Sequence, residues 1–231
     1  MPGLSIILPV LDEADIIADA LTALAPLRQR GAEVIVVDGG SRDGTVDLAR
    51  PAADRVIASP RGRAAQMNAG AALARGAVLL FLHADTRLPG NADALVLAGL
   101  ERSGRAWGRF DIAIAGRSPL LAIVAAAINF RSRLTRIATG DQAIFVSRDV
   151  FAAVGGFPDI ALMEDVALSR ALKRISRPVC VAAKVTTSGR RWEQHGVLRT
   201  VVLMWRLRLA YFLGAEPATL ARRYGYVPRK P

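Results

Sequence analysis

Acidic and imidazole side chains follow apolar runs at three places in the first half of the chain. Asp12 and Glu13 come after the first run, residues 38–43 after the second, and residues 83–85 after the fourth. Carboxylates and imidazoles exchange hydrogen bonds, bind cations and move protons. If the apolar runs are strands of one sheet, these polar groups meet at one edge and form a binding site.

The segment at residues 36–45 reads Val-Val-Asp-Gly-Gly-Ser-Arg-Asp-Gly-Thr. Its small residues let a ligand approach the backbone, and Asp38 offers acceptor oxygens to N–H groups. The alternative is structural, with Asp43 capping the next helix and Asp38 solvating a strand end. Both interpretations stay open on this segment alone.

His83 and Asp85 are two residues apart and share one side if the chain there is extended. A hard divalent cation that bridges a diphosphate needs only one or two protein carboxylates. Asp85 is therefore the candidate metal ligand, and His83 either ligates the metal or supports Asp85. The alternative is a solvated loop in which Asp85 caps a helix.

Glu164 and Asp165 begin a predicted helix after the turn at residues 155–158. Adjacent acids in a first helical turn are typical partners of the helix dipole. They are also placed as a general base would be, near an attacking hydroxyl. On these residues alone, the dipole interpretation is favoured.

Two groups of cationic and polar residues add candidates. Arg190 and Arg191 sit in a predicted flexible loop and can neutralise a diphosphate, while Trp192 stacks on a sugar or packs against a helix. Arg63 and Gln66 lie on a predicted helix and can reach a phosphate or a nucleotide edge. A solvated helix face is the alternative for that pair.

The elements that position these residues alternate through the first half of the chain. Apolar strands at 4–10, 34–37, 55–59 and 78–82 are separated by helices at 12–30, 43–50 and 63–75. This order predicts a parallel sheet covered on both faces, with sites outside the carboxyl ends of its strands. In the second half we predict strands at 107–115, 142–146 and 179–183, and helices at 91–102, 118–134, 163–174, 197–213 and 217–224.

Composition limits the class of protein. The single cysteine, Cys180, excludes a disulfide scaffold, and no apolar stretch reaches the roughly 20 residues that span a bilayer. The net charge of +11 divides into −2 for residues 1–100 and +13 for residues 101–231. The excess arginines are scattered among apolar helices without a nucleic-acid motif, so we expect no specific nucleic-acid partner. The phosphate loop of kinases and the Gly-x-Gly-x-x-Gly spacing of dinucleotide sites are also absent.

The motifs in order resemble the family 2 glycosyltransferases of the GT-A fold. The resemblance covers about residues 4–195 and rests on Pro-Val-Leu-Asp-Glu at 9–13, Val-Asp-Gly-Gly-Ser-Arg-Asp-Gly-Thr at 37–45, Gly-Arg-Ala-Ala-Gln-Met-Asn at 62–68, Leu-His-Ala-Asp-Thr at 82–86, Glu164-Asp165 and Arg191-Trp192. In detail, His-Ala-Asp-Thr and Arg-Ala-Ala-Gln-Met-Asn resemble a small bacterial arsenosugar-biosynthesis-type subgroup. The implied fold is a mostly parallel central sheet flanked by helices, residues 1–195, with a helical C-terminal extension, residues 196–231.

The resemblance also implies site roles. The implied nucleotide-sugar site contains Pro9, Glu13, Asp38, Asp43, Arg63, Arg190, Arg191 and Trp192. Asp85, with His83, would hold Mg²⁺ or Mn²⁺, and Asp165 of the Glu164-Asp165 pair would be the catalytic base. His83 replaces the first acid of the family's metal motif, and Ser188 replaces the Gln of its Gln-x-x-Arg-Trp motif, which argues against processive synthesis.

We therefore predict an inverting, metal-assisted transfer of a hexosyl group from a nucleotide-diphosphate sugar to an unknown hydroxyl acceptor. The alternative is a nucleotidyltransferase or a non-catalytic nucleotide-binding protein of similar fold. Helices 118–134 and 197–213 either lie on an anionic membrane surface, facing a lipid-linked acceptor, or pack on the domain or in a homodimer. With no signal peptide at the N-terminus, the expected location is the cytoplasm, including the inner face of the membrane.

Overall fold

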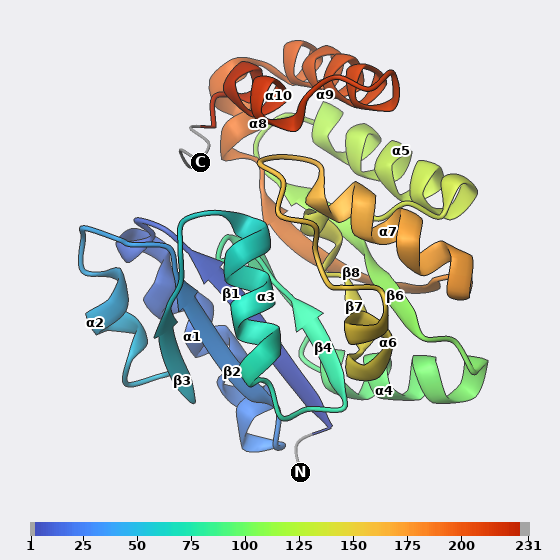
Figure 1. The fold of residues 1–231 in the computed structure, drawn as a ribbon. Helices are drawn as coiled ribbons and strands as arrows, with labels where there is room; N and C mark the ends of the chain where they lie inside the picture. The colour runs from blue at the N-terminus through green and yellow to red at the C-terminus, as the bar shows by residue number, and fades with distance from the viewer. Residues whose placement is uncertain (1–2, 227–231) are drawn as a thin grey trace.

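Strand β1 (Leu4–Val10) lies inside an eight-stranded sheet that runs through the whole molecule (Figure 1). The computed structural model describes residues 3–226. The strand order is β3-β2-β1-β4-β7-β6-β8-β5. The other strands are β2 (Glu33–Asp38), β3 (Arg55–Ala58), β4 (Val78–Phe81), β5 (Thr86–Arg87), β6 (Trp107–Ala115), β7 (Phe145–Ser147) and β8 (Val179–Ser188).

The N-terminal half of the sheet is parallel, as its apolar strands predict. β1 pairs with β2 and β4, and β2 pairs with β3, all in parallel. β1 and β2 have only one position that is not fully buried, Pro9, because helices cover both faces. The helices between these strands are α1 (Ala14–Gln29), α2 (Thr45–Ala49) and α3 (Arg63–Leu73).

The C-terminal half of the sheet is mixed and corrects several predicted elements. β7 runs antiparallel to both β4 and β6, and β5 runs antiparallel to β8. The strand predicted at 142–146 begins only at Phe145, because residues 140–142 form a 3-10 turn, η1 (Gly140–Gln142). The strand predicted at 179–183 extends to Ser188, and a helix that the sequence did not predict, α6 (Arg148–Ala153), follows β7.

Two apolar layers hold helices to the sheet. Successive β1 residues point to opposite faces, so that Ile6 joins the layer with α1 and α4 (Ala92–Ser103), and Ile7 joins the layer with α3 and α7 (Glu164–Ile175). Both layers are closely packed. A Cβ added to Gly70 of α3 would lie 2.6 Å from Ile7.

The C-terminal helices form a third layer over one end of the molecule (Figure 1). Leu207 of α9 (Val197–Phe212) and Leu220 of α10 (Pro217–Tyr224) pack with Ile137, Met163 and Val166. α9 also contacts α5 (Leu120–Thr135) and the short helix α8 (Arg190–His195). Residues 196–226 of the predicted C-terminal extension therefore pack on the domain, around the start of α7, and its residues 227–231 lie outside the described part of the chain. Within residues 3–226, no helix has the length and apolar composition needed to span a bilayer.

Candidate active site

The loops after β1 and β2 are fastened to each other by acidic side chains. Asp38 ends β2 and accepts hydrogen bonds from the backbone N–H groups of Gly40 (2.9 Å) and Ser41 (3.1 Å). Asp43 accepts from the N–H of Ala14 (3.0 Å) and from Thr45, and the Thr45 hydroxyl in turn accepts from the Glu13 N–H (2.8 Å). The hydrogen bonds that Asp43 accepts lower its pKa, and the bond from the Thr45 side chain has the largest effect. The two loops thus form one rigid rim, with Asp38 and Glu13 on it.

Gln66 does not reach this rim as a ligand-binding group. Its side chain is buried and donates to the carbonyl oxygens of Val10 and Val37, both at 2.8 Å. The amide thereby ties α3 to the ends of β1 and β2. The sequence-based interpretation of Gln66 as a nucleotide contact is wrong in this structure, because both amide hydrogens are used inside the fold.

Glu13, His83 and Asp85 gather at the ends of β1 and β4. Burial and then the negative charge of Asp85 raise the pKa of Glu13, while Arg190, Arg63 and His83 oppose that rise. Residues 83–86 form a turn closed by a hydrogen bond from the Thr86 N–H to the His83 carbonyl (3.0 Å), so the extended geometry expected for His83 and Asp85 is wrong. The two side chains still share the neighbourhood of Glu13.

The metal-ligating potential of this cluster lies mainly in Asp85. Asp85 is exposed, whereas the imidazole Nδ1 of His83 lies 3.3 Å from a carboxylate oxygen of Asp141 in η1. Among residues 3–226, no group of three or more His, Cys, Asp or Glu side chains is arranged to hold a metal by itself. The exposed Asp85 carboxylate, which accepts a hydrogen bond from the Thr86 hydroxyl (3.2 Å), lies beside Glu13 and fits a hard cation whose remaining ligands come from a diphosphate.

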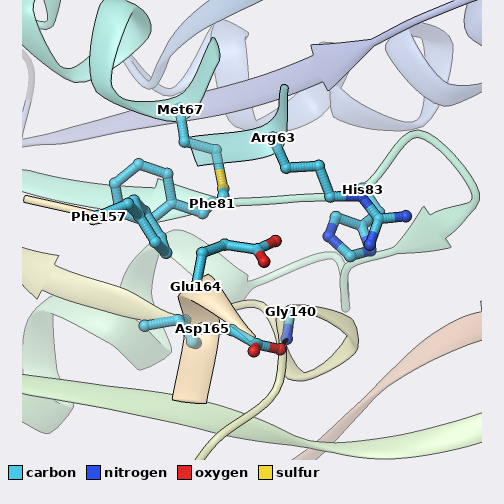
Figure 2. A pocket seen from close by; sticks show the side chains of 9 residues that line it. Arg63, Met67, Phe81, His83, Gly140, Phe157, Glu164 and Asp165 are labelled. Carbon is cyan, nitrogen blue, oxygen red and sulfur yellow. Dashed lines mark hydrogen bonds between the residues drawn. The ribbon is translucent and has the colours of Figure 1, made fainter. Parts of the chain in front are cut away.

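Glu164 and Asp165 face a hollow between the two halves of the sheet (Figure 2). They are the first two residues of α7, as predicted, and the residue before them, Met163, is held by packing at φ 71°, which non-glycine residues rarely adopt. In Figure 2 the Glu164 carboxylate points toward Arg63 and His83. The Asp165 carboxylate instead accepts from the N–H of Gly140 (2.8 Å).

The electrostatics separate the two acids. Burial, and after it the negative charge of Asp165, raise the pKa of Glu164 to about 7. Burial lowers the pKa of the Arg63 guanidinium, but Glu164 and other nearby acidic groups outweigh it, and the net change is a rise. The hollow therefore contains a desolvated carboxyl group that titrates near neutral pH, beside a cation that can meet an anionic ligand.

The segment expected to be a flexible loop with Arg190, Arg191 and Trp192 is helix α8, and that expectation is wrong. Arg190 still lies near Glu13, and Trp192 is half-buried. The Arg191 guanidinium lies over the Tyr224 ring, 3.7 Å from its centre, and hydrogen-bonds to the Tyr224 carbonyl. Arg191 is therefore held by α10, and Arg190 is the arginine of α8 that lies on the β1 side.

Four residues near the site were not assigned to it from the sequence. Asp141, Arg131, Arg208 and Tyr224 all interact electrostatically with Asp165 or its neighbours. Arg131 and Arg208 belong to the arginines that are scattered among the apolar helices of the C-terminal half. A charged residue within an apolar helix was the only sequence signal for these arginines, because no local pattern predicts that α5 and α9 pack near the start of α7.

Fold and site together define an α/β protein whose acidic side chains gather at the carboxyl edge of its sheet, where ligands bind in folds of this class. A family model, Glycosyl transferase family 2, matches residues 5–121, just over half of the chain. The chain belongs to glycosyl transferase family 2, which confirms the family predicted from the motifs. The arsenosugar-type subgroup stays a prediction.

Known relatives agree with this family. A PGL/p-HBAD biosynthesis glycosyltransferase of Mycobacterium bovis is 38% identical in a 94-residue alignment that covers 38% of this chain and 37% of that protein. The alignment thus spans little more than a third of that relative's length.

Solved structures confirm the GT-A fold. A mannosyltransferase of Pyrobaculum calidifontis, in complex with GDP-Man and Mn²⁺, has a TM-score of 0.64 at 20% identity and covers 97% of this chain and 69% of that one. TarS 1–349 of S. aureus, in complex with UDP-GlcNAc, has a TM-score of 0.66 at 17% identity and covers 81% and 58%. At these identities the likeness shows the fold alone.

Proposed function

We propose that this chain transfers a hexosyl group from a nucleotide-diphosphate sugar to a hydroxyl acceptor, with inversion at the anomeric carbon. The observation that carries the proposal is the position of Glu164 and Asp165 at the start of α7, facing the hollow lined by Arg63 and His83. Family membership and the sugar-nucleotide complexes of the structural neighbours support the same donor class.

Asp165 acts as the general base in this proposal. It takes the proton of the acceptor hydroxyl as the oxygen attacks the anomeric carbon, and the bond from that carbon to the diphosphate oxygen breaks on the opposite face. The Gly140 N–H fixes one Asp165 oxygen. The Glu164 carboxyl group points toward Arg63 and His83, on the side of the hollow where the donor binds in this proposal.

The donor lies along the rim formed by the loops after β1 and β2. Pro9 and Glu13 line the nucleotide pocket, Asp38 recognises the base, and Asp43 holds the loop in shape. Arg63 and Arg190 contribute positive charge near the diphosphate. Arg191 and Trp192 brace this side through α8 and α10.

Asp85 would hold Mg²⁺ or Mn²⁺, and His83 would orient the turn through its contact with Asp141. Bound there, a divalent cation supplies charge that stabilises the departing diphosphate. The Mn²⁺ in the mannosyltransferase complex supports a divalent cation in this role.

The acceptor side carries an exposed apolar face, which we name the α5–α9 face. Its side chains are 53–79% exposed: Ile123, Phe130 and Leu134 of α5, Leu198, Val202, Trp205, Leu209 and Phe212 of α9, and Leu213. On α9 their spacing alternates between four and three residues, so they form one stripe, with Arg199 and Arg206 exposed on the same helix. We propose that this face docks on an anionic membrane surface and that the acceptor is lipid-linked.

Substitution of Asp165 by Asn tests the transfer reaction. Asn keeps the shape and the acceptor oxygen for Gly140 but cannot take a proton, so we expect turnover to fall by about 100-fold or more. The affinity for the nucleotide donor should stay within about threefold. The measurement is release of free nucleoside diphosphate from a panel of sugar donors and acceptors, with donor affinity from calorimetry.

Asp149→Asn, an exposed change on α6, is the matched control. Unchanged turnover in Asp165→Asn would remove Asp165 from the mechanism. Release of pyrophosphate from a nucleoside triphosphate and a sugar phosphate, with no nucleoside diphosphate released from the sugar donors, would instead identify a nucleotidyltransferase.

A further inference from the structure

Arg131 of α5 carries a guanidinium with two buried nitrogen atoms that no acceptor in the described part of the chain satisfies. Its Nε and Nη2 atoms are buried and have no hydrogen-bond partner. No ion pair between residues 3–226 involves Arg131 or Arg208. Buried N–H donors without acceptors are costly, and unsatisfied buried groups in native proteins commonly meet a ligand, an ion or water.

Arg208 of α9 lies near Arg131 of α5 and interacts with it electrostatically. Its neighbour Leu207 packs with Met163 and Val166, the residues that flank Glu164 and Asp165. α5 and α9 are in contact, and Figure 1 shows both at the end of the molecule where the C-terminal helices lie. Packing therefore brings both arginines to the start of α7, although they lie 77 positions apart in the sequence.

The two guanidinium groups repel each other and share one acid. Burial, and then the charge of Arg208, lower the pKa of Arg131 to about 10, while Asp165 opposes the change. Burial also lowers the pKa of Arg208, against Asp165 and Asp141. Both acids are engaged elsewhere, Asp165 with the Gly140 N–H and Asp141 with His83. The positive charge of Arg131 and Arg208 is therefore not fully balanced by these two acids.

The arrangement separates the two sides of the catalytic pair. Arg63 and His83 act on Glu164, and Arg63 acts more weakly on Asp165 as well, whereas Arg131 and Arg208 act on Asp165 alone of the pair. If the donor lies on the Glu164 side, the arginine pair lies across Asp165 from it. That is where a group attached to the acceptor hydroxyl has to be.

We propose that Arg131 and Arg208 form an anion subsite that binds a phosphate or carboxylate group of the acceptor beside Asp165. Guanidinium groups suit this role because their N–H donors form paired hydrogen bonds with such oxyanions. The assignment to the acceptor rests on the proposed function. It adds that the acceptor is an anion, with its charged group within reach of the hydroxyl that is glycosylated.

The test uses the full chain and inorganic phosphate as the probe. The donor site is first saturated with UDP and Mg²⁺, and phosphate is titrated at constant ionic strength while thermal unfolding is followed. Phosphate that binds the native state raises the unfolding temperature. We expect Arg131→Met and Arg208→Met each to weaken phosphate binding by about tenfold or more, since each removes charge-assisted hydrogen bonds.

Arg174→Met, an exposed change at the far end of α7, removes the same charge and should leave phosphate binding unchanged. UDP affinity, measured separately, should stay within about twofold in all three variants. If Arg131→Met fails to fold, Arg208→Met and Arg131→Lys replace it, and the lysine variant should lose part of the binding because it lacks the planar fork.

Wild-type phosphate affinity in both Met variants would overturn the subsite. If the two Met variants lose as much affinity for UDP as for phosphate, the subsite is also overturned, because the arginines then bind the donor diphosphate. Phosphatidylcholine vesicles with and without phosphatidic acid then identify the source of the anion. A loss of phosphatidic-acid binding in Arg208→Met but not Arg174→Met indicates a lipid acceptor, whereas a loss for free phosphate alone indicates a soluble one.

Either of those two results upholds the subsite. Normal phosphate and UDP binding without sugar transfer in the wild type would refute the proposed function and leave the anion site standing.

Discussion

The buried carboxyl group of Glu164 should make the stability of this protein depend on pH. Glu164 is 6% exposed, and burial followed by the charge of Asp165 raises its pKa from 4.5 to about 7. A folded-state pKa above the unfolded value means that the folded state binds the proton more tightly. The contribution to stability is therefore complete at low pH and is lost as pH rises through 7.

The change to test is Glu164→Gln, which keeps the side-chain size and cannot ionise. At about 1.4 kcal/mol per pKa unit, ionisation of Glu164 costs the folded state about 3 kcal/mol once the pH is well above 7. At about pH 5 the cost is under about 1 kcal/mol, because the carboxyl group is mostly protonated in the folded state. Relative to the wild type, Glu164→Gln should therefore gain about 2 to 3 kcal/mol between about pH 5 and about pH 8.

The assay is urea unfolding of the wild type and the variant at both pH values. The difference in unfolding free energy is taken from the midpoints, after checking that the slopes agree. Glu101→Gln, an exposed change on α4, is the control and should show no pH-dependent difference. A Glu164→Gln difference that stays constant within about 0.5 kcal/mol across the two pH values would refute the desolvated-carboxyl reasoning.

Two further changes test the metal and the membrane proposals. Asp85→Asn should weaken UDP binding by about tenfold or more with Mn²⁺ present and improve it slightly without metal, because the substitution removes both a hard ligand and a charge that repels the diphosphate. Asp15→Asn, exposed on α1, should do neither, and an Asp85→Asn effect of the same size with and without Mn²⁺, measured by calorimetry, would exclude Asp85 as the ligand. Leu209→Ser should reduce the binding constant for anionic vesicles, measured by co-sedimentation, by roughly tenfold, which corresponds to the free energy of burying one leucine side chain. Leu48→Ser on α2 should leave that constant unchanged. If Leu209→Ser instead lowers the molar mass in analytical ultracentrifugation, the α5–α9 face is a dimer interface and the membrane proposal is wrong.

The parallel half of the fold was predictable because its signals are local. Apolar strands such as β1 and β2 alternate with helices, and acids follow them at the edge where ligands bind in such sheets. The start of α7 at Glu164 was predictable for the same reason. Asp38, Asp43 and Asp85 could be nominated from their place after a strand, without knowledge of any contact across the sheet.

The mixed half of the sheet was less predictable because its strands are short and their partners are distant. β7 has three residues, and its pairing with β4 joins segments about 65 positions apart. Gln66 looked like a free polar group on a helix face, and only the packing of α3 on β1 and β2 shows that its amide is used internally. Arg191 likewise looked free until α10 folded back over it.

The sequence by itself determined the family, the parallel sheet and the order of the acids along its carboxyl edge, because those properties follow from residue type and spacing within short segments. Only the tertiary structure decided what surrounds each acid. Glu164 and Asp165 are neighbours in the chain, yet Arg63 interacts more strongly with Glu164, and Arg131 and Arg208 interact only with Asp165 of the two. Burial and the charges of α3, α5 and α9 set these environments, and those helices meet at α7 through side-chain packing that no local pattern encodes.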